Sequence, residues 1–250
     1  MSVLDLFFPR QVKCIFCSRE TREFGICDEC YKALPFIEKP ICHVCGGRLI
    51  GKGKVCIECK GRSFDFDRCF AVLSYEGDVQ QKIISFKQNG NKYIGETFAW
   101  LMERKFNELF LDVDLIVPVP ISENRHKERG FNQSEVLCSE LVVSHKVSTD
   151  LILRTVDTPH QTGLSRENRE NNLHNCFKVV DKKKVKGKNI LLIDDIYTTG
   201  STLNECSRTL RKSGANKIYA LCLARAPIKM DRVEESVQDK KKNPLAFDGE

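Results

Sequence analysis

Short apolar runs and helically spaced apolar residues alternate along the chain from residue 68 to residue 224. The short runs are typical of buried strands. They cover 68–75, 111–120, 147–155, 176–180, 189–196 and 217–224. The helical spacing occurs at 78–89, 92–110, 131–144 and 201–213. Strands that alternate with helices of this length predict βαβ units and a parallel sheet, so we expect an α/β fold with helices flanking the sheet.

Polar stretches separate these elements. We expect a loop at 157–175 and a solvated turn at 182–187. The region before residue 63 has few large apolar residues, and the residues after 228 are charged and without period. These changes predict three parts: a small N-terminal domain at 1–62, an α/β domain at 63–228 and a disordered tail at 229–250.

The composition narrows the class of protein. The 250 residues are 41% hydrophobic and 30% charged, which suits a globular chain. No apolar run approaches the ~20 residues that a membrane span needs. The first residues lack the basic start and long apolar stretch of a signal peptide, so we expect a cytoplasmic protein. The net charge of +6 permits a polyanionic partner without requiring one.

Cysteine is the unusual residue, with thirteen in the chain. Eight of them form four Cys-x-x-Cys pairs before residue 60, and the five others are scattered singly and are expected to be small buried residues. The paired cysteines are Cys14 and Cys17, Cys27 and Cys30, Cys42 and Cys45, and Cys56 and Cys59. Two such pairs supply the four thiolates of a structural zinc site.

The spacing of the pairs favours two successive zinc ribbons. The gaps between neighbouring pairs are 9, 11 and 10 residues, and interleaved pairing is also compatible with them. A redox dithiol usually occurs as one pair that opens a helix after a strand, which four copies do not match. About 60 residues with so few apolar side chains could hardly fold without a cross-link such as a bound metal ion. We therefore expect two structural zinc ions.

The segment LLIDDIYTTGST, residues 191–202, carries the richest chemistry. An apolar strand leads to Asp194 and Asp195, a short polar loop follows, and a helix begins. Ligands of open α/β sheets bind at the carboxyl ends of the strands, and a helix N-terminus attracts anions. Gly200 lets the backbone approach a phosphate closely. The two carboxylates suit a ribose diol or magnesium.

This segment resembles the phosphoribosyl pyrophosphate (PRPP) signature of type I phosphoribosyltransferases. The resemblance implies that Asp194 and Asp195 contact the ribose hydroxyls, with magnesium bound alongside PRPP. It implies that the loop holds the 5′-phosphate through Thr198, Thr199, Gly200, Ser201 and Thr202. The expected fold is thus a type I phosphoribosyltransferase-like sheet preceded by a double zinc ribbon.

Two further segments, 117–137 and 158–172, narrow the resemblance to the ComF family of competence-related proteins. That family joins a zinc ribbon to a phosphoribosyltransferase-like domain, which is the order found here. The resemblance makes 118–130 the loop that follows the first strand, on the pyrophosphate side of the site, and places Arg125, Lys127 and Arg129 there. It also makes 158–171 a hood-side loop, where Arg166 and Arg169 could meet phosphate.

The resemblance leaves two functions open. One is a PRPP-binding protein that takes part in single-stranded DNA uptake or processing, with DNA and a competence helicase-type protein as partners. The other is an active phosphoribosyltransferase that acts on an unidentified nitrogen nucleophile. Met1 and Ser2 are not followed by the N-terminal cysteine of amidophosphoribosyltransferases, so ammonia delivery from glutamine is not expected. No base-recognition signature is evident, and the sequence does not specify an oligomeric state.

Overall fold

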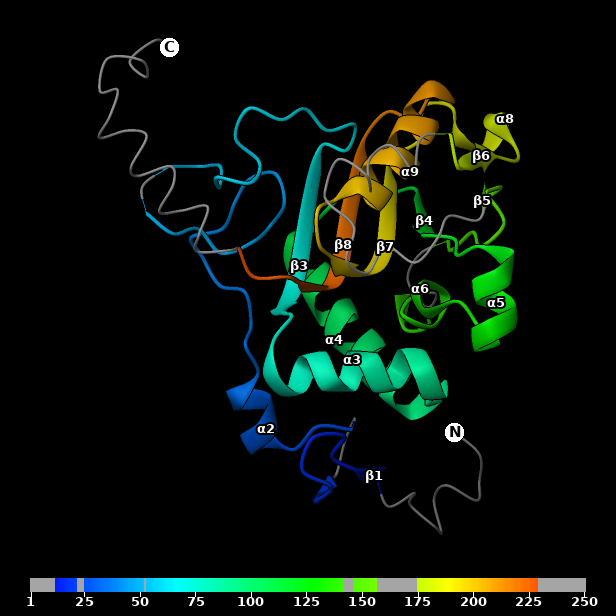
Figure 1. Cartoon of the computed structure of the whole chain (residues 1–250). Coiled ribbons are helices and arrows are strands. Elements are labelled where there is room, and N and C mark those ends of the chain that lie inside the picture. The colour runs from blue at the N-terminus through cyan, green and yellow to red at the C-terminus, as the bar shows by residue number, and fades with distance from the viewer. Residues whose placement is uncertain (1–11, 22–24, 52, 142–145, 157–174, 229–250) are drawn as a thin grey trace.

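Four parallel strands form the central sheet, in the order β3-β8-β7-β4 (Figure 1). Their bounds are Arg68–Ser74 for β3, Ile218–Arg225 for β8, Ile190–Tyr197 for β7 and Leu115–Pro118 for β4. This computed structural model describes residues 12–21, 25–51, 53–141, 146–156 and 175–228. The predicted parallel sheet with flanking helices is confirmed.

The middle strands owe their position to their apolar residues. Side chains alternate across a strand, and in β7 they enter two different cores. Ile190 and Leu192 belong to one core, and Leu191 and Ile193 belong to the other. A strand that is apolar on both faces is stable only where helices or other segments cover both sides.

Helices supply that cover. One face packs against α3 (Gly77–Asn89) and α4 (Lys92–Leu109), which contribute Phe86 and Phe98 to its core. The other face packs against α9 (Ser201–Lys212), whose Leu203, Cys206 and Leu210 are buried there. The predicted helices at 78–89, 92–110 and 201–213 thus lie within a residue or two of the observed ones.

The segment after β4 differs from the sequence prediction. We expected a loop at 118–130, but Glu123–Arg129 forms helix α5, because Ser122 caps its first turn and Gly130 ends it in a left-handed conformation. The single helix expected at 131–144 is wrong, since α6 covers Gln133–Val136 and residues 137–140 form turns. Leu137 and Leu141 are nevertheless buried as expected, through a chain of turns rather than a long helix.

Two expected strands of the main sheet form a separate hairpin-like pair. β5 (Ile152–Arg154) and β6 (Phe177–Val179) pair antiparallel with each other. Val147 makes an isolated parallel bridge to Ile116 of β4, so the predicted strand 147–155 starts beside the sheet and then leaves it. The expected turn at 182–187 contains a short helix, α8 (Lys182–Val185), because Asp181 accepts a hydrogen bond from the Lys183 backbone N–H.

The N-terminal region forms short elements that pack on the sheet. They are β1 (Val12–Lys13), β2 (Glu20–Thr21) and α2 (Asp28–Ala33). Residues 35–37 run along the free edge of β3, where Phe36 pairs with Leu73 and the Ile37 N–H donates to Val72. This contact covers an edge that would otherwise be open to another strand.

The remaining predictions concern membrane spans and residues outside the described part of the chain. Among the described residues, no helix is both long and apolar enough to cross a membrane. The predicted tail at 229–250 and all of the predicted loop at 157–175 except residue 175 lie outside the described residues, as do Arg166 and Arg169. The division into parts at 62 and 228 stays a prediction.

Candidate functional site

The two acidic residues lie near the carboxyl end of β7, where the strand leaves the core. The Asp194 carboxylate accepts hydrogen bonds from the Asp195 backbone N–H at 2.9 Å and from the Ser134 hydroxyl at 3.4 Å. Asp195 forms an ion pair with Lys87 of α3, with 2.8 Å between Nζ and Oδ2. Sequence reasoning missed Ser134 and Lys87. Ser134 lies in the family segment 117–137 but was not singled out there, and Lys87 comes from a helix without a recognised motif.

The environment of Asp194 disfavours its charge. Burial raises its pKa to about 7, and the neighbouring Asp195 carboxylate adds to the rise. The Asp195 backbone N–H, Lys87 and Ser134 partly oppose this shift. Asp194 can therefore change its protonation state near neutral pH, which is a feature of functional sites.

The polar loop turns sharply between β7 and α9. Gly200 has φ of +80°, and an added Cβ there would lie 2.4 Å from the Tyr197 hydroxyl oxygen. The hydroxyl oxygens of Thr199 and Ser201 lie 2.7 Å apart. The loop ends at the N-terminus of a twelve-residue helix, where unpaired N–H groups and the helix dipole favour an anion. Thr198 is exposed, and Thr202 lies in the first turn of α9.

Arg125 lies close enough to Arg154, Arg129 and Asp195 for their charges to act on it. Burial lowers the pKa of Arg125, and the nearby charges of Arg154 and Arg129 lower it further, while Asp195 opposes them. Arg154 comes from β5 and was not expected from the sequence. Lys127, by contrast, pairs with Glu123 at 2.8 Å on the exposed surface of α5. The structure thus brings Arg125 near the acid pair and engages Lys127 elsewhere.

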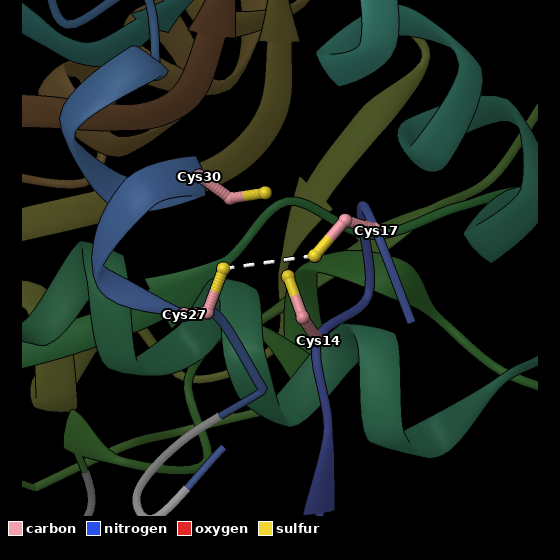
Figure 2. A group of neighbouring side chains, drawn as sticks. All are labelled: Cys14, Cys17, Cys27 and Cys30. Atoms are coloured by element: carbon pink, nitrogen blue, oxygen red, sulfur yellow. Dashed lines mark hydrogen bonds between the residues drawn. The ribbon is translucent and has the colours of Figure 1, made fainter. Parts of the chain in front are cut away.

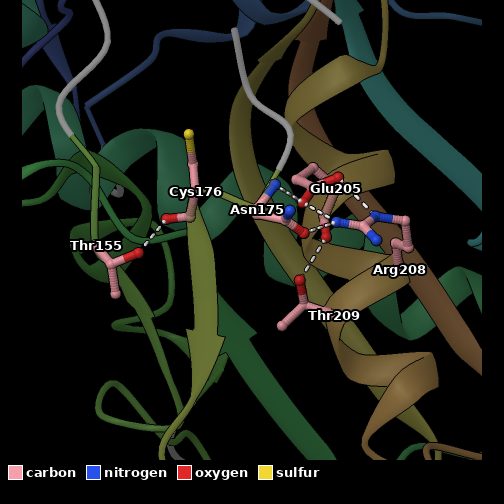
Figure 3. A network of polar contacts seen from close by, with 6 residues as sticks. All are labelled: Thr155, Asn175, Cys176, Glu205, Arg208 and Thr209. Atoms are coloured by element: carbon pink, nitrogen blue, oxygen red, sulfur yellow. Dashed lines mark hydrogen bonds and ion pairs between the residues drawn. The ribbon is translucent and has the colours of Figure 1, made fainter. Parts of the chain in front are cut away.

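The residues that flank the segment 157–174 are tied to one another and to α9 (Figure 3). The Thr155 backbone N–H donates to the Cys176 carbonyl at 2.8 Å. The Asn175 N–H donates to the Glu205 carboxylate at 2.7 Å, and Arg208 bridges Asn175 and Glu205. Both ends of the segment are therefore held beside the helix that begins at the polar loop.

In the described part of the chain, two groups of four cysteines bring their sulfur atoms within 4.8 Å of one another. The first group, shown in Figure 2, is Cys14, Cys17, Cys27 and Cys30. The second group is Cys42, Cys45, Cys56 and Cys59. The pairing is successive, not interleaved.

Both groups have the dimensions of a tetrahedral zinc site. Zinc–sulfur bonds of about 2.3 Å imply sulfurs about 3.8 Å apart. The Cys17 and Cys27 sulfurs lie 3.6 Å apart, and those of Cys45 and Cys56 lie 3.7 Å apart. The Arg19 backbone N–H lowers the pKa of Cys17 to about 6, which favours the thiolate that a metal binds. The two groups are therefore consistent with structural zinc.

A groove of about 840 Å³ lies away from the acid pair, between the N-terminal region, β3 and α4. The aromatic rings that line the groove are those of Tyr31, Phe36 and Phe70. Trp100 lies outside the lining and packs against Tyr31 with 5.9 Å between ring centroids, and the Arg104 guanidinium lies 5.1 Å from the Trp100 centroid. The basic residues that line the groove are Lys39, Arg68, Arg104 and Lys105, and the acidic ones are Glu38 and Glu108. The groove thus combines aromatic rings with an excess of positive charge.

Comparison with known protein families agrees with this organisation. Residues 3–60 match the double zinc ribbon domain, and residues 130–248 match the phosphoribosyl transferase domain. The first match contains both cysteine groups, and the second contains the acid pair and the polar loop. The fold and the site together define a phosphoribosyltransferase-like protein that carries a double zinc ribbon.

Curated relatives narrow this class. Competence protein F of Haemophilus influenzae is 31% identical over 86% of this chain and 97% of its own length. DNA utilization protein YhgH of Escherichia coli K12 is 30% identical over 81% of this chain and 91% of its own. Competence protein ComFC of Bacillus subtilis is 28% identical over 76% and 79%. The chain belongs to the ComF family of competence proteins.

Solved structures add a weaker likeness. The allosteric regulatory enzyme of purine biosynthesis is 16% identical to the chain, with a TM-score of 0.36. The match covers 52% of this chain and about a quarter, 26%, of that structure's chain. This likeness carries no weight in the functional argument.

We expect metal analysis to find two zinc ions per chain in protein purified under reducing conditions. Replacing Cys14 and Cys17 by serine should leave one zinc ion, and so should replacing Cys42 and Cys45, because each pair serves a separate group. Structural zinc contributes roughly 10–16 kcal/mol to folding in small zinc domains, so chelation should unfold the N-terminal region. Folded protein without zinc would contradict this assignment.

We expect Asp194→Asn to stabilise the free protein at alkaline pH. The folded pKa of Asp194, about 7, lies above the unfolded value of ~3.9, so the wild type loses stability as pH rises through this interval. The variant has no such loss, and its advantage at pH 8 should be on the order of 4 kcal/mol, since each pKa unit corresponds to about 1.4 kcal/mol. Thermal unfolding at pH 5 and pH 8 measures it.

Asp114→Asn is the control of opposite sign. The Asn189 N–H and Lys188 lower the pKa of Asp114, so its contribution is present above the unfolded pKa and is lost as the pH falls. Asp114→Asn should therefore destabilise the protein at pH 8. If the stability of the wild type and of Asp194→Asn depends on pH in the same way, the fold does not raise the pKa of Asp194.

Proposed function

We propose that this protein binds PRPP with magnesium at the carboxyl end of β7 and uses this site in single-stranded DNA uptake or processing. One observation carries the proposal. The acid pair and the N-terminus of α9 lie together at the carboxyl end of β7, and Arg125 is near enough for the charge of Asp195 to act on it. This arrangement offers acceptors for a diol, donors for a phosphate and a cation for a diphosphate in one place.

The acid pair is suited to the ribose. Asp194 and Asp195 accept hydrogen bonds from the two ribose hydroxyls, and charge-assisted bonds of this kind are strong. In the free protein their oxygens accept from Asp195 N–H, Ser134 and Lys87. The PRPP hydroxyls compete for these carboxylate oxygens. Lys87 then lies near the bound ligand and can interact with its negative charge.

The loop and the arginines are suited to the phosphates. The backbone N–H groups of Gly200 to Thr202 and the Thr199 hydroxyl donate to the 5′-phosphate. Arg125, with Arg129 and Arg154 close by, favours the diphosphate at the other end of the ligand. The carboxylates also suit magnesium, which when bound neutralises part of the diphosphate charge.

The names of the relatives support a role with DNA. The Haemophilus influenzae and Bacillus subtilis proteins are called competence proteins, and the Escherichia coli protein is called a DNA utilization protein. We infer a related role here, in the cytoplasm, where thiols stay reduced and can hold zinc. A competence helicase-type protein is the partner that this role implies.

Single-stranded DNA has a candidate surface in the groove beside β3. Bases stack on aromatic rings, and the backbone follows positive charge. Tyr31 and Arg104 both line the groove, and the Arg104 guanidinium carbon lies 5.7 Å from the Tyr31 ring centroid, so the groove provides both features. The groove is separate from the acid pair, so DNA and PRPP could be bound at the same time.

A transferase reaction is the second candidate function, and the arrangement of the site favours it in one respect. A nitrogen nucleophile would attack C1 of PRPP and lose a proton, while the C1–O bond breaks and its electron pair leaves with pyrophosphate. Positioning and charge stabilisation would supply most of the rate. Arg125, near Asp195, is where the pyrophosphate charge would develop.

We expect calorimetry to detect PRPP binding to the full chain in the presence of magnesium. Asp194→Asn with Asp195→Asn should weaken it at least about tenfold, because hydrogen bonds to charged groups contribute ~1.5–3 kcal/mol. Thr199→Val should also weaken it. Thr209→Val removes a hydroxyl from the far end of the same helix and should leave affinity unchanged. Unaltered binding in the first two variants would refute the site.

We expect single-stranded DNA to bind with an affinity that falls steeply with salt, because displaced counterions drive such binding. Arg104→Glu should weaken it about tenfold at ~50 mM salt. Lys92→Glu makes the same charge change on α4, where Lys92 pairs with Glu96, and should have little effect. Fluorescence anisotropy with a labelled oligonucleotide provides the measurement.

Pyrophosphate release separates the two functions. If single-stranded DNA fails to bind at ~50 mM salt, the DNA role as stated is rejected. Release of pyrophosphate from PRPP in the same preparation, lost in the acid-pair variant, would then assign the protein as a transferase.

A further inference from the structure

Arg225, the last residue of β8, is a buried cation, with 3% of its surface exposed. Its Nε donates to the Cys45 sulfur at 3.4 Å, and its Nη2 pairs with the Glu58 carboxylate at 2.7 Å. Both partners belong to the second cysteine group or its loop. A buried charge is tolerated only where partners of this kind satisfy it, so the second ribbon and Arg225 depend on each other.

The opposite side of Arg225 faces the strand that leads to the polar loop. Arg225 is the register partner of Tyr197 in the sheet, and its guanidinium carbon lies 5.3 Å from the Tyr197 ring centroid. The Ala226 N–H donates to the Tyr197 carbonyl at 2.9 Å. The arginine is thus stacked between the second ribbon and Tyr197.

Tyr197 in turn supports the loop. Its ring is buried, and its hydroxyl oxygen lies so close to Gly200 that a Cβ there would be at 2.4 Å. That hydroxyl has no hydrogen-bond partner among the described residues, so packing alone holds it under the loop. A displacement of Tyr197 would therefore move Gly200 and the start of α9.

The residues that follow the second cysteine group make a second contact with the same loop. Arg62 Nη1 donates to the Thr199 carbonyl at 3.2 Å. The Asp65 N–H donates to the Asn204 side chain in the first turn of α9 at 2.7 Å. The loop thus has two supports: the Tyr197 ring packs against Gly200, and Arg62 donates a hydrogen bond to the Thr199 carbonyl.

The first cysteine group is attached to a different part of the molecule. Its Ile15 and Ile26 enter the core on the α3–α4 face, and Tyr93 of α4 donates to the Lys13 carbonyl at 2.7 Å. The cysteines of the second group enter the core on the α9 face. The two ribbons therefore lie against opposite faces of the sheet, and the α9 face is the one that leads to the loop.

We propose that Arg225 is a positioning residue that couples the second zinc ribbon to the conformation of the phosphate loop. The ribbon holds Cys45 and Glu58, these orient Arg225, and Arg225 fixes Tyr197 under Gly200. Residues that donate to metal ligands orient them and are themselves oriented, which makes such contacts sensitive to the metal. The meaning of this coupling for ligand affinity rests on the proposed PRPP site, whereas the coupling to the loop does not.

Amide hydrogen exchange of the full, zinc-loaded chain tests the coupling without any ligand. Arg225→Met removes the contacts with Cys45 and Glu58, together with the Nη1 donation to the Ala226 carbonyl, and keeps an unbranched side chain. We expect exchange of residues 198–202 to accelerate about tenfold, while exchange of residues 190–193 in β7 stays close to wild type. A residue with a general structural role would accelerate both segments alike.

Two further variants make the test decisive. Glu58→Gln leaves Arg225 in place and should give a smaller acceleration of the same loop. Arg19→Met is the matched control, since Arg19 pairs with Glu29 beside the first cysteine group. It should leave the loop unchanged. If Arg225→Met does not fold, Glu58→Gln alone decides.

Zinc content and PRPP affinity complete the experiment. Arg225→Met with two bound zinc ions, rapid loop exchange and PRPP binding weakened about tenfold supports the proposal. Loop exchange equal to wild type, or acceleration spread over β7, overturns it. Absence of PRPP binding in the wild type would reject the proposed function instead, and the exchange data would still judge the coupling.

Discussion

The position of β7 between β4 and β8 is the constraint on which the rest of the structure depends. Ile190 to Ile193 are fully buried, and each such side chain contributes about 1.5–3 kcal/mol on burial. The strand cannot shift its register without exposing these side chains. Their burial therefore offsets the free-energy cost of burying the Asp194 carboxyl that follows them. Because parallel strands end at one edge of the sheet, the same constraint delivers the acid pair, the polar loop and the start of α9 to one place.

The two ribbons extend this arrangement to both faces of the sheet. Neither has enough apolar residues for a core of its own, and each contributes its apolar or sulfur side chains to a core that it shares with the sheet. The first ribbon packs with α3 and α4, and the second packs with α9. A metal site is usually regarded as a local staple, yet here the second one lies against a buried arginine at the end of a sheet strand. In this chain the zinc ribbons and the phosphoribosyltransferase fold are thus joined by the hydrophobic cores that they share.

Much of this could be predicted from local patterns, and what could not depends on contacts between distant segments. The parallel sheet followed from apolar runs such as 189–196, and both cysteine groups followed from Cys-x-x-Cys spacing. The helix expected at 131–144 was wrong because turns can bury Leu137 and Leu141 as well as a helix can. Helix α5 was missed because its polar residues lack an apolar stripe. Lys87, Arg154 and Arg225 carry no motif, because only the packing of α3, β5 and β8 in the folded chain brings them to their positions.

A crystal structure of the full chain with zinc, magnesium and PRPP is the most direct test of the central claim, that the end of β7 is the ligand site. The account expects the 5′-phosphate against the backbone N–H groups of residues 199–202, the ribose hydroxyls against Asp194 and Asp195, and the diphosphate towards Arg125. PRPP bound in the groove beside Trp100, or a polar loop left empty at saturating PRPP, would contradict it.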